Sequence, residues 1–144
     1  MSLLLIAEHD NSKLKVFTLN AINAASKIDG DIHVLVAGSG CENVSKEVAA
    51  VPLVKKVLLC DSPNYKNYLP ENLAPLVTKL AEKYDQIVAS ANTFGKNFMP
   101  RVAASLDVSQ VAMLLKSIVQ ILLLDLFMLE MLLQRLKAMI KRNV

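Results

Sequence analysis

The first 111 residues alternate short apolar runs with segments in which apolar residues recur every three or four positions. The runs at 3–7, 32–37, 57–60 and 86–91 have the length and polar borders of buried strands. They begin about 24 to 30 residues apart, with one helical segment between each pair. This rhythm predicts right-handed crossovers and an α/β fold, in which a parallel sheet of four to five strands carries helices on both faces.

The apolar spacing also predicts which helix faces are buried. These faces carry Leu14, Phe17, Ala21, Ala24 and Ile28 in the first helix, Val44, Val48 and Val51 in the second, Leu73, Leu76, Val77, Leu80 and Tyr84 in the third, and Phe98, Val102 and Leu106 in the fourth. Asp10, Asn11 and Ser12 can cap the first helix, and Asn92 with Thr93 can cap the fourth.

The pattern changes at Ala112, which divides the chain into a body, 1–111, and a tail, 112–144. The tail contains ten leucines and four of the six methionines. Leu115, Leu122, Leu129 and Leu136 stand seven positions apart, which predicts a Leu-rich C-terminal helix with a zipper-like seam. Charged residues interrupt this segment too closely for a membrane span.

Composition narrows the possible functions. A chain of 144 residues suits one domain, and two cysteines without a Cys/His cluster predict neither a disulfide framework nor a metal site. The body has eleven basic and eleven acidic residues, so the net charge of +3 belongs to the tail. A neutral body argues against nucleic-acid binding. The first apolar run is too short for a signal peptide, which predicts a cytoplasmic protein.

Polar residues follow three of the predicted strands, where open α/β sheets bind ligands. Glu8 and His9 follow the first strand, either for acid–base chemistry or as part of a polar turn that caps a helix. The turn Gly38-Ser39-Gly40 could approach a phosphate, but it lacks the third glycine of a dinucleotide motif, which favours a plain turn.

The segment from Asn92 to Asn97 follows the fourth strand. Thr93, Gly95 and Lys96 could hold an anion at a helix N-terminus, or they could merely begin the helix. Together with Glu8, His9 and Arg101, they are the candidate anion or partner contacts, and no catalytic residue is predicted. His33 is expected to be a half-buried strand residue, and Cys41 and Cys60 are expected to be packing residues.

Three segments resemble the electron transfer flavoprotein alpha subunit. These are L-L-I-A-E-H-D-N at 4–11, I-H-V-L-V-A-G at 32–38 and N-T-F-G-K-N-F-M-P-R-V-A-A-S-L-D-V-S-Q at 92–110. The resemblance covers the body and implies a Rossmann-like, adenine-nucleotide-hydrolase-like domain. In the family, this domain belongs to an electron carrier and not to an enzyme.

The resemblance also implies partners and a cofactor. The alpha subunit pairs with a beta subunit and carries electrons on FAD from dehydrogenases to a quinone oxidoreductase. Most FAD contacts come from a second, C-terminal alpha domain that does not follow here, so this chain is expected to bind no FAD and to be inactive alone.

The tail departs from the family near Ala112. Codons permitted for 124–135, regrouped from the third base, can read R-P-I-Y-A-G-N-A-I-A-T, which is similar to the family's next segment. We therefore expect the tail to be an out-of-frame translation that exposes an apolar stripe and promotes association. Two alternatives are a stand-alone adenine-nucleotide-binding module and a protein that dimerises through the leucine seam.

Overall fold

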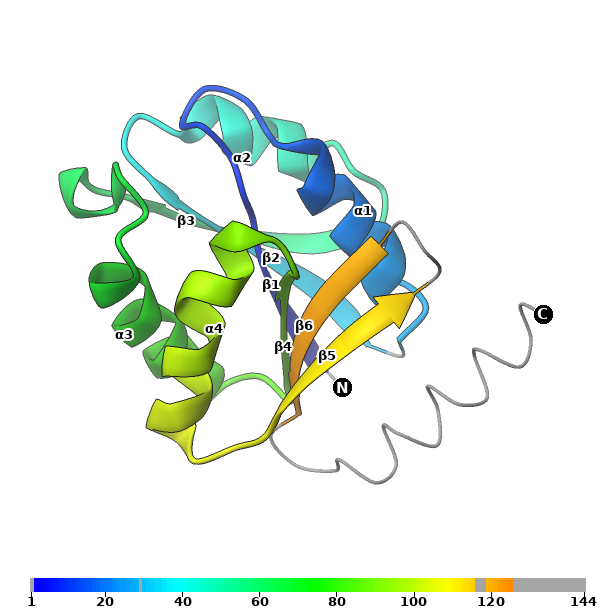
Figure 1. The fold of residues 1–144 in the computed structure, drawn as a ribbon. Coiled ribbons are helices and arrows are strands. Elements are labelled where there is room, and N and C mark those ends of the chain that lie inside the picture. The colour runs from blue at the N-terminus through cyan, green and yellow to red at the C-terminus, as the bar shows by residue number, and fades with distance from the viewer. Residues whose placement is uncertain (1, 29, 116–118, 126–144) are drawn as a thin grey trace.

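The fold is a mixed six-stranded sheet between two layers of helices (Figure 1). The computed structural model describes residues 2–28, 30–115 and 119–125, with side chains described as far as residue 110. The elements, in chain order, are β1 (Ser2–Ile6), α1 (Val16–Ala25), β2 (Asp31–Gly38), α2 (Glu42–Ala49), β3 (Val54–Asp61), the 3₁₀ helix η1 (Pro63–Tyr65), α3 (Pro70–Ala81), β4 (Gln86–Ser90), α4 (Thr93–Leu106), β5 (Gln110–Leu115) and β6 (Val119–Asp125).

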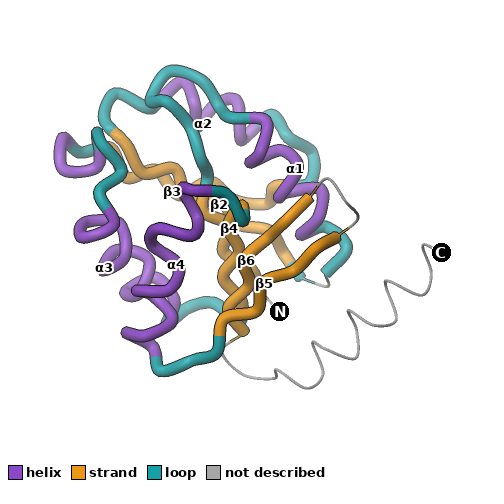
Figure 2. The backbone as a smooth tube through the Cα atoms, in the orientation of Figure 1, coloured by secondary structure: helices purple, strands orange, loops and turns teal. Residues whose placement is uncertain are grey.

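The sheet order is β3-β2-β1-β4-β6-β5. The first four strands in this order run parallel, which confirms the predicted parallel sheet. Strand β6 lies antiparallel to β4, and β5 lies antiparallel to β6. The sheet therefore has two more strands than its parallel part, in a hairpin at one edge (Figure 2).

The hairpin corrects the expectation of a helix starting at Ala112. Residues 112–115 and 119–125 form strands, and the rest of the predicted tail helix, 126–144, lies outside the described residues. Pairing with β6 occupies backbone groups of β4 that would otherwise form an open edge. This requirement of the sheet outweighs the local preference of a leucine-rich segment for helix.

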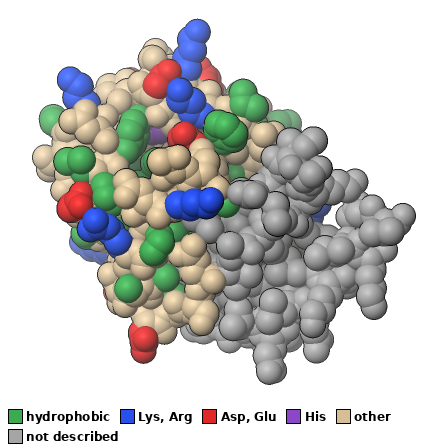
Figure 3. Space-filling model, viewed as in Figure 1, with side chains coloured by type: hydrophobic (Ala, Val, Ile, Leu, Met, Phe, Trp, Pro, Cys, Tyr) green, Lys and Arg blue, Asp and Glu red, His purple; other side chains and the backbone are tan. Residues whose placement is uncertain are grey.

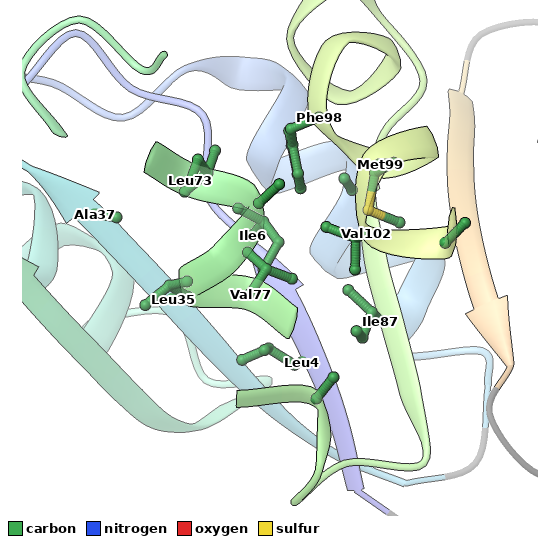
Figure 4. Close-up of a cluster of buried hydrophobic side chains, with 14 of the residues drawn as sticks. Leu4, Ile6, Leu35, Ala37, Leu73, Val77, Ile87, Phe98, Met99 and Val102 are labelled. Carbon is green, nitrogen blue, oxygen red and sulfur yellow. The ribbon is translucent and has the colours of Figure 1, made fainter. Parts of the chain in front are cut away.

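Helices cover both faces of the sheet, as the sequence predicted. One buried cluster joins alternate residues of β1 to α1 and α2, and the other joins the remaining residues of β1 to α3 and α4. Figure 4 shows the second cluster, which contains Leu4 and Ile6 of β1, Val77 of α3 and Phe98 of α4. Leu4 is therefore as fully buried as Leu5, its neighbour on the opposite face, as expected for a central strand covered on both sides.

The first helix differs from the prediction at its start. It begins at Val16 after Lys15, with no side-chain cap, so the expectation that Asp10, Asn11 or Ser12 caps it is wrong. Asp10 instead closes a tight turn, in which its carboxylate accepts hydrogen bonds from the backbone of Ser12 and Lys13. Residues 10–13 thus form a loop between β1 and the helix.

The later start also changes the buried face of α1. Phe17, expected in the core, is 55% exposed. Thr18 is fully buried instead. Its hydroxyl accepts a hydrogen bond from the Glu8 amide and donates one to the Glu8 carbonyl. The predicted cap of the fourth helix is confirmed, because the Asn92 side chain accepts a hydrogen bond from the Gly95 amide.

Candidate functional site

Hydrogen bonds join the loops at the carboxyl ends of β1, β2 and β4. Asn92, after β4, donates from Nδ2 to the Glu8 carboxylate, after β1. Asn11 accepts the Ser39 amide at 2.9 Å and donates to the Lys66 carbonyl at 3.0 Å. We refer to Glu8, His9, Asn11, Tyr68 and Asn92 as the strand-end cluster. It lies where open α/β sheets bind ligands.

His9 is the centre of this cluster and is only 3% exposed. Its Nδ1 accepts the Asn11 amide at 3.1 Å and lies 2.9 Å from the Tyr68 hydroxyl. Because an amide can only donate, Nδ1 is unprotonated and the proton of the neutral ring is on Nε2. Nε2 is buried and makes no hydrogen bond of good geometry, although the Ala37 carbonyl lies close enough to the ring to favour its protonated form.

Burial lowers the pKa of His9, and the Ala37 carbonyl and the charge of Asp10 oppose this effect more weakly. The carboxylates on either side of His9 have other partners. Glu8 accepts from Asn92, and hydrogen bonds from Ser12 and Lys13 lower the pKa of exposed Asp10 to about 2. This arrangement supports a structural turn more than an acid–base pair.

The turn Gly38-Ser39-Gly40 has its amides engaged by the protein itself. The Ser39 amide donates to Asn11, and the amides of Gly40 and Cys41 donate to the two oxygens of Asp61 at 2.9 and 3.1 Å. A Cβ on Gly38 would lie 2.7 Å from His9 Cε1. Close packing against His9 therefore explains this glycine without a bound phosphate.

The turn Gly38-Ser39-Gly40 does not fit the pyrophosphate of an FAD molecule. A dinucleotide needs free amides in a glycine-rich turn, and the amides of Ser39, Gly40 and Cys41 already have acceptors. The space beside Gly38 is filled by the side chains of His9 and Asn11. This turn therefore offers no free amides to a dinucleotide.

The N-terminus of α4 is engaged in a similar way. The Gly95 amide donates to the Asn92 side chain, and the Lys96 amide donates to the Asn92 carbonyl. Gly95 is buried, and a Cβ there would clash with the Ser90 carbonyl. The exposed side chains of Thr93 and Lys96 are the parts of this candidate segment that project into solvent.

The remaining candidate, Arg101, pairs with Glu71 at 3.0 Å. This ion pair joins α4 to α3, and both side chains are more than half exposed. The structure thus brings Glu8 and His9 to the start of α4, but it directs Arg101 to another helix.

Sequence reasoning missed Tyr68 and Asp61. Tyr68 has a positive φ of 53°, and burial raises the pKa of its hydroxyl to about 12. Both residues lie at or after the end of β3, and only the fold places them beside loops that are distant in the sequence. The expectations for His33 and the cysteines are confirmed. His33 is half-buried and 3.0 Å from the Tyr84 hydroxyl. Both cysteines are free thiols; Cys41 is buried in one core cluster, and Cys60 is partly buried against the other.

The surface of the described body carries mixed charge. On the face drawn in Figure 3, basic and acidic side chains are interspersed among apolar and neutral atoms, in agreement with the neutral balance of residues 1–111. Within 2–28, 30–115 and 119–125, no helix has the length and apolar character to cross a membrane.

Comparison with known proteins identifies the family. Residues 3–121 match the electron transfer flavoprotein domain. The chain is 51% identical over 112 residues to the electron transfer flavoprotein subunit alpha of Pseudomonas aeruginosa, covering 78% of this chain and 36% of that protein. It is 43% identical over 113 residues to a probable mitochondrial alpha subunit of Caenorhabditis elegans, covering 77% and 34%. The chain thus spans about a third of these relatives' length, and it belongs to the electron transfer flavoprotein family.

Proposed function

We propose that this chain is the N-terminal domain of an electron transfer flavoprotein alpha subunit, and that it acts as a scaffold without holding the flavin. The observation that carries this proposal is the family match over residues 3–121 in a chain that spans about a third of its relatives' length. The engaged amides of Ser39, Gly40 and Cys41 support it, because the turn after β2 leaves no cradle for a dinucleotide.

In the intact protein, this domain would serve an electron carrier rather than an enzyme. The beta subunit would be its direct partner, and dehydrogenases and a quinone oxidoreductase would exchange electrons with the FAD held by the rest of the assembly. The cytoplasm of a bacterium is the proposed location. Thr93, Lys96 and Arg101 are the candidate residues whose side chains are exposed for contact with a partner, with Arg101 also paired to Glu71.

We further propose that residues 112–144 are read out of frame, so that the frame of the family domain ends near Ala112, although the family match continues to residue 121. The support is that one permitted set of codons for 124–135, regrouped from the third base, gives a sequence similar to the family's next segment. The hairpin of β5 and β6 is compatible with this proposal, because backbone pairing with β4 is open to many apolar sequences.

Flavin content tests the scaffold proposal. The purified chain, incubated with excess FAD and separated from free flavin, is expected to be colourless near 450 nm. A gene whose frame is restored after codon 112 would encode a longer chain. The protein purified after its expression together with a beta subunit is expected to be yellow. Stoichiometric FAD on the short chain would contradict the proposal.

The contacts at the strand ends disfavour the alternative of an adenine-nucleotide-binding module. The amides of Ser39, Gly40 and Cys41, which would face a phosphate, already donate hydrogen bonds to Asn11 and Asp61. The ring of Tyr68 packs edge to face against His9. Calorimetric titration with AMP and ATP is expected to detect no binding at millimolar concentration, and saturable binding below that range would favour the alternative.

A further inference from the structure

A short segment between η1 and α3 lies against the ring of His9. Residues 66–69 follow Tyr65, which packs against the core cluster of α3 and α4, and precede Pro70, which is buried at the start of α3. Tyr68 is the partly buried member of this segment, and its ring meets His9 edge to face with centroids 5.1 Å apart. The other three residues are exposed. We refer to residues 66–69 as the lid.

Two hydrogen bonds join the lid to the loop after β1. The Tyr68 hydroxyl lies 2.9 Å from Nδ1 of His9, and the Lys66 carbonyl accepts from Nδ2 of Asn11 at 3.0 Å. The backbone amide of Asn11 donates to the same Nδ1 at 3.1 Å. The first bond thus depends directly on an unprotonated Nδ1. The second depends on the position of Asn11, which that nitrogen also helps to hold.

Both residues that His9 holds have a left-handed backbone. The φ of Tyr68 is 53° and that of Asn11 is 68°. Asparagine tolerates this region, but a bulky aromatic residue rarely adopts it, and such a conformation persists only where neighbouring contacts impose it. Loss of the bond to His9 therefore allows the lid to relax to an ordinary backbone conformation.

Protonation of His9 removes the acceptor that closes the lid. An imidazolium ring has donors on both nitrogens, so the Asn11 amide hydrogen would face the proton on Nδ1. A reversed bond, from Nδ1 to the Tyr68 oxygen, would leave a charged ring that is only 3% exposed, and a buried charge is unfavourable. The Ala37 carbonyl and the backbone of Gly38 lie against other parts of the ring. Because these belong to an inner strand, the lid is the neighbour that can move without breaking the sheet.

Several charged or titratable side chains surround His9. They are Glu8 and Asp10 beside it in the chain, Cys41 after β2, Asp61 at the end of β3, and Lys66 and Tyr68 in the lid. Asp10, with a pKa of about 2, stays ionised between pH 7.5 and 5. Burial raises the pKa of the Cys41 thiol and of the Tyr68 hydroxyl, so both stay protonated. The two other carboxylates already accept hydrogen bonds from the protein. His9 is therefore the group whose protonation removes an acceptor from the lid.

We propose that His9 is a proton-operated latch, and that residues 66–69 move away from His9 and Asn11 when its ring is protonated. Opening uncovers the His9 ring and the ring of Phe94, which meets Tyr68 edge to face at 6.1 Å. Because the residues on either side of the lid are packed in the fold, the core stays in place. The latch thus makes access to the strand ends depend on pH.

Amide hydrogen exchange of the complete chain, divided by the intrinsic exchange rate at each pH, tests the latch. The reporters are the amides of Asn11, bonded to His9, and of Tyr68, bonded to the Tyr65 carbonyl. Protection of both should fall by up to about thirtyfold from pH 7.5 to 5, because a histidine with the ordinary pKa of about 6.5 in the open state binds a proton that the closed state resists. At each pH, both should exchange faster than Val77 in α3, since the lid opens without unfolding of the core.

The two histidines of the chain provide a matched pair of variants. His9→Gln keeps an acceptor but cannot be protonated, so protection of the Tyr68 amide should no longer depend on pH. His33→Gln should keep the wild-type dependence. Protection of the Tyr68 amide that is constant with pH in the wild-type chain would overturn the proposal. So would a fall that persists in His9→Gln, or equal protection of Tyr68 and Val77, because the lid would then open only when the chain unfolds.

Coupling between the lid and the ring supplies an arm that keeps His9 intact. Tyr68→Phe removes a donor that stabilises the neutral ring, so the NMR resonance of His9 Cε1 should titrate at a higher pH than in the wild-type chain. Tyr65→Phe, at the other tyrosine between β3 and α3, should leave this midpoint unchanged. An unchanged or lower midpoint in Tyr68→Phe would overturn the latch, because the hydroxyl would then not respond to the proton.

Discussion

The Tyr68 hydroxyl donates a hydrogen bond to Nδ1 of His9 at 2.9 Å and joins two loops 59 residues apart in the sequence. The direction of this bond follows from the Asn11 amide, which donates to the same nitrogen at 3.1 Å. The two rings meet edge to face, with centroids 5.1 Å apart. A proton on Nδ1 would oppose the Asn11 donor and remove both bonds.

Acid is therefore expected to destabilise the fold through His9. Because burial lowers the pKa of His9 in the folded state, the unfolded state binds more protons below the ordinary pKa of about 6.5. The free energy of unfolding should be highest above that pH and should decrease as the pH falls below it. Urea unfolding from pH 7.5 to 5 measures this decrease.

The variant His9→Gln isolates the contribution of this residue. It should be less stable at pH 7.5 and should show a smaller decrease toward pH 5. Asp10, with a pKa of about 2, stays ionised in this range. An unchanged pH dependence in His9→Gln would contradict the assignment.

Removing the hydroxyl of Tyr68 should weaken the contact between the loops. Tyr68→Phe keeps the ring and loses one partly buried hydrogen bond, at a cost of about 1 kcal/mol in the free energy of unfolding. Tyr65→Phe is the matched control, because Tyr65 lies in the same loop and its hydroxyl does not bond His9. Equal stability of the two variants would show that the bond contributes little.

High pH tests the hydrogen bond between Tyr68 and His9 by removing the proton of the tyrosine. The pKa of Tyr68 is raised to about 12, so its hydroxyl keeps its proton in the folded state when an ordinary tyrosine has lost it. Its contribution to stability is present below about pH 10 and is lost as the pH rises toward 12. Burial also raises the pKa of Tyr65 and of Tyr84, so ultraviolet titration of tyrosinate should show that the last group to ionise in the wild-type chain is missing in Tyr68→Phe.

The approach of α4 to β4 depends on the absence of a side chain at Gly95. A Cβ there would clash with the Ser90 carbonyl, which belongs to the backbone and cannot turn aside. Gly95→Ala should cost about 2 kcal/mol or more in urea unfolding. Gly40→Ala, at a φ of 67° in open space, should cost only about 1 to 2 kcal/mol of backbone strain. A smaller cost at Gly95 than at Gly40 would refute this packing argument.

Asn92 should stabilise the start of α4. Asn92→Ala removes the cap on the Gly95 amide and the hydrogen bond to Glu8, with an expected loss of about 1 to 2 kcal/mol. Asn97→Ala, at an exposed position of the same helix, should be neutral or slightly stabilising. Thermal unfolding of both variants at one pH makes the comparison, and a neutral Asn92→Ala would contradict the capping role.

The parallel part of the fold was predictable because its strands are continuous apolar runs. The edge strand β3 was predicted only from 57 to 60, whereas it extends from Val54 to Asp61. Lys55 and Lys56 at its start are exposed, so hydrophobic pattern alone stops short of them. The strands within 112–125 were missed for another reason. Their formation depends on pairing with β4, and the local sequence pattern carries no information about that pairing.

The candidate site was predictable in its location and not in its contacts. Strand ends pointed to Glu8, His9 and the start of α4, and the structure places these near one another. The contacts could not be predicted because the loop amides donate hydrogen bonds to Asn11 and Asp61, which are distant from that loop in the sequence. Phe17 shows the same limit, because helical spacing fitted a buried face that the late start of α1 turns toward solvent.

The DNA sequence of the gene on both sides of codon 112 is the most direct test of the claim that the flavin-binding part of an electron transfer flavoprotein alpha subunit is missing from this chain. The account predicts that the nucleotides after this codon, read in another register, encode the family's continuation, including R-P-I-Y-A-G-N-A-I-A-T. A downstream sequence that resembles the family in no register would contradict it.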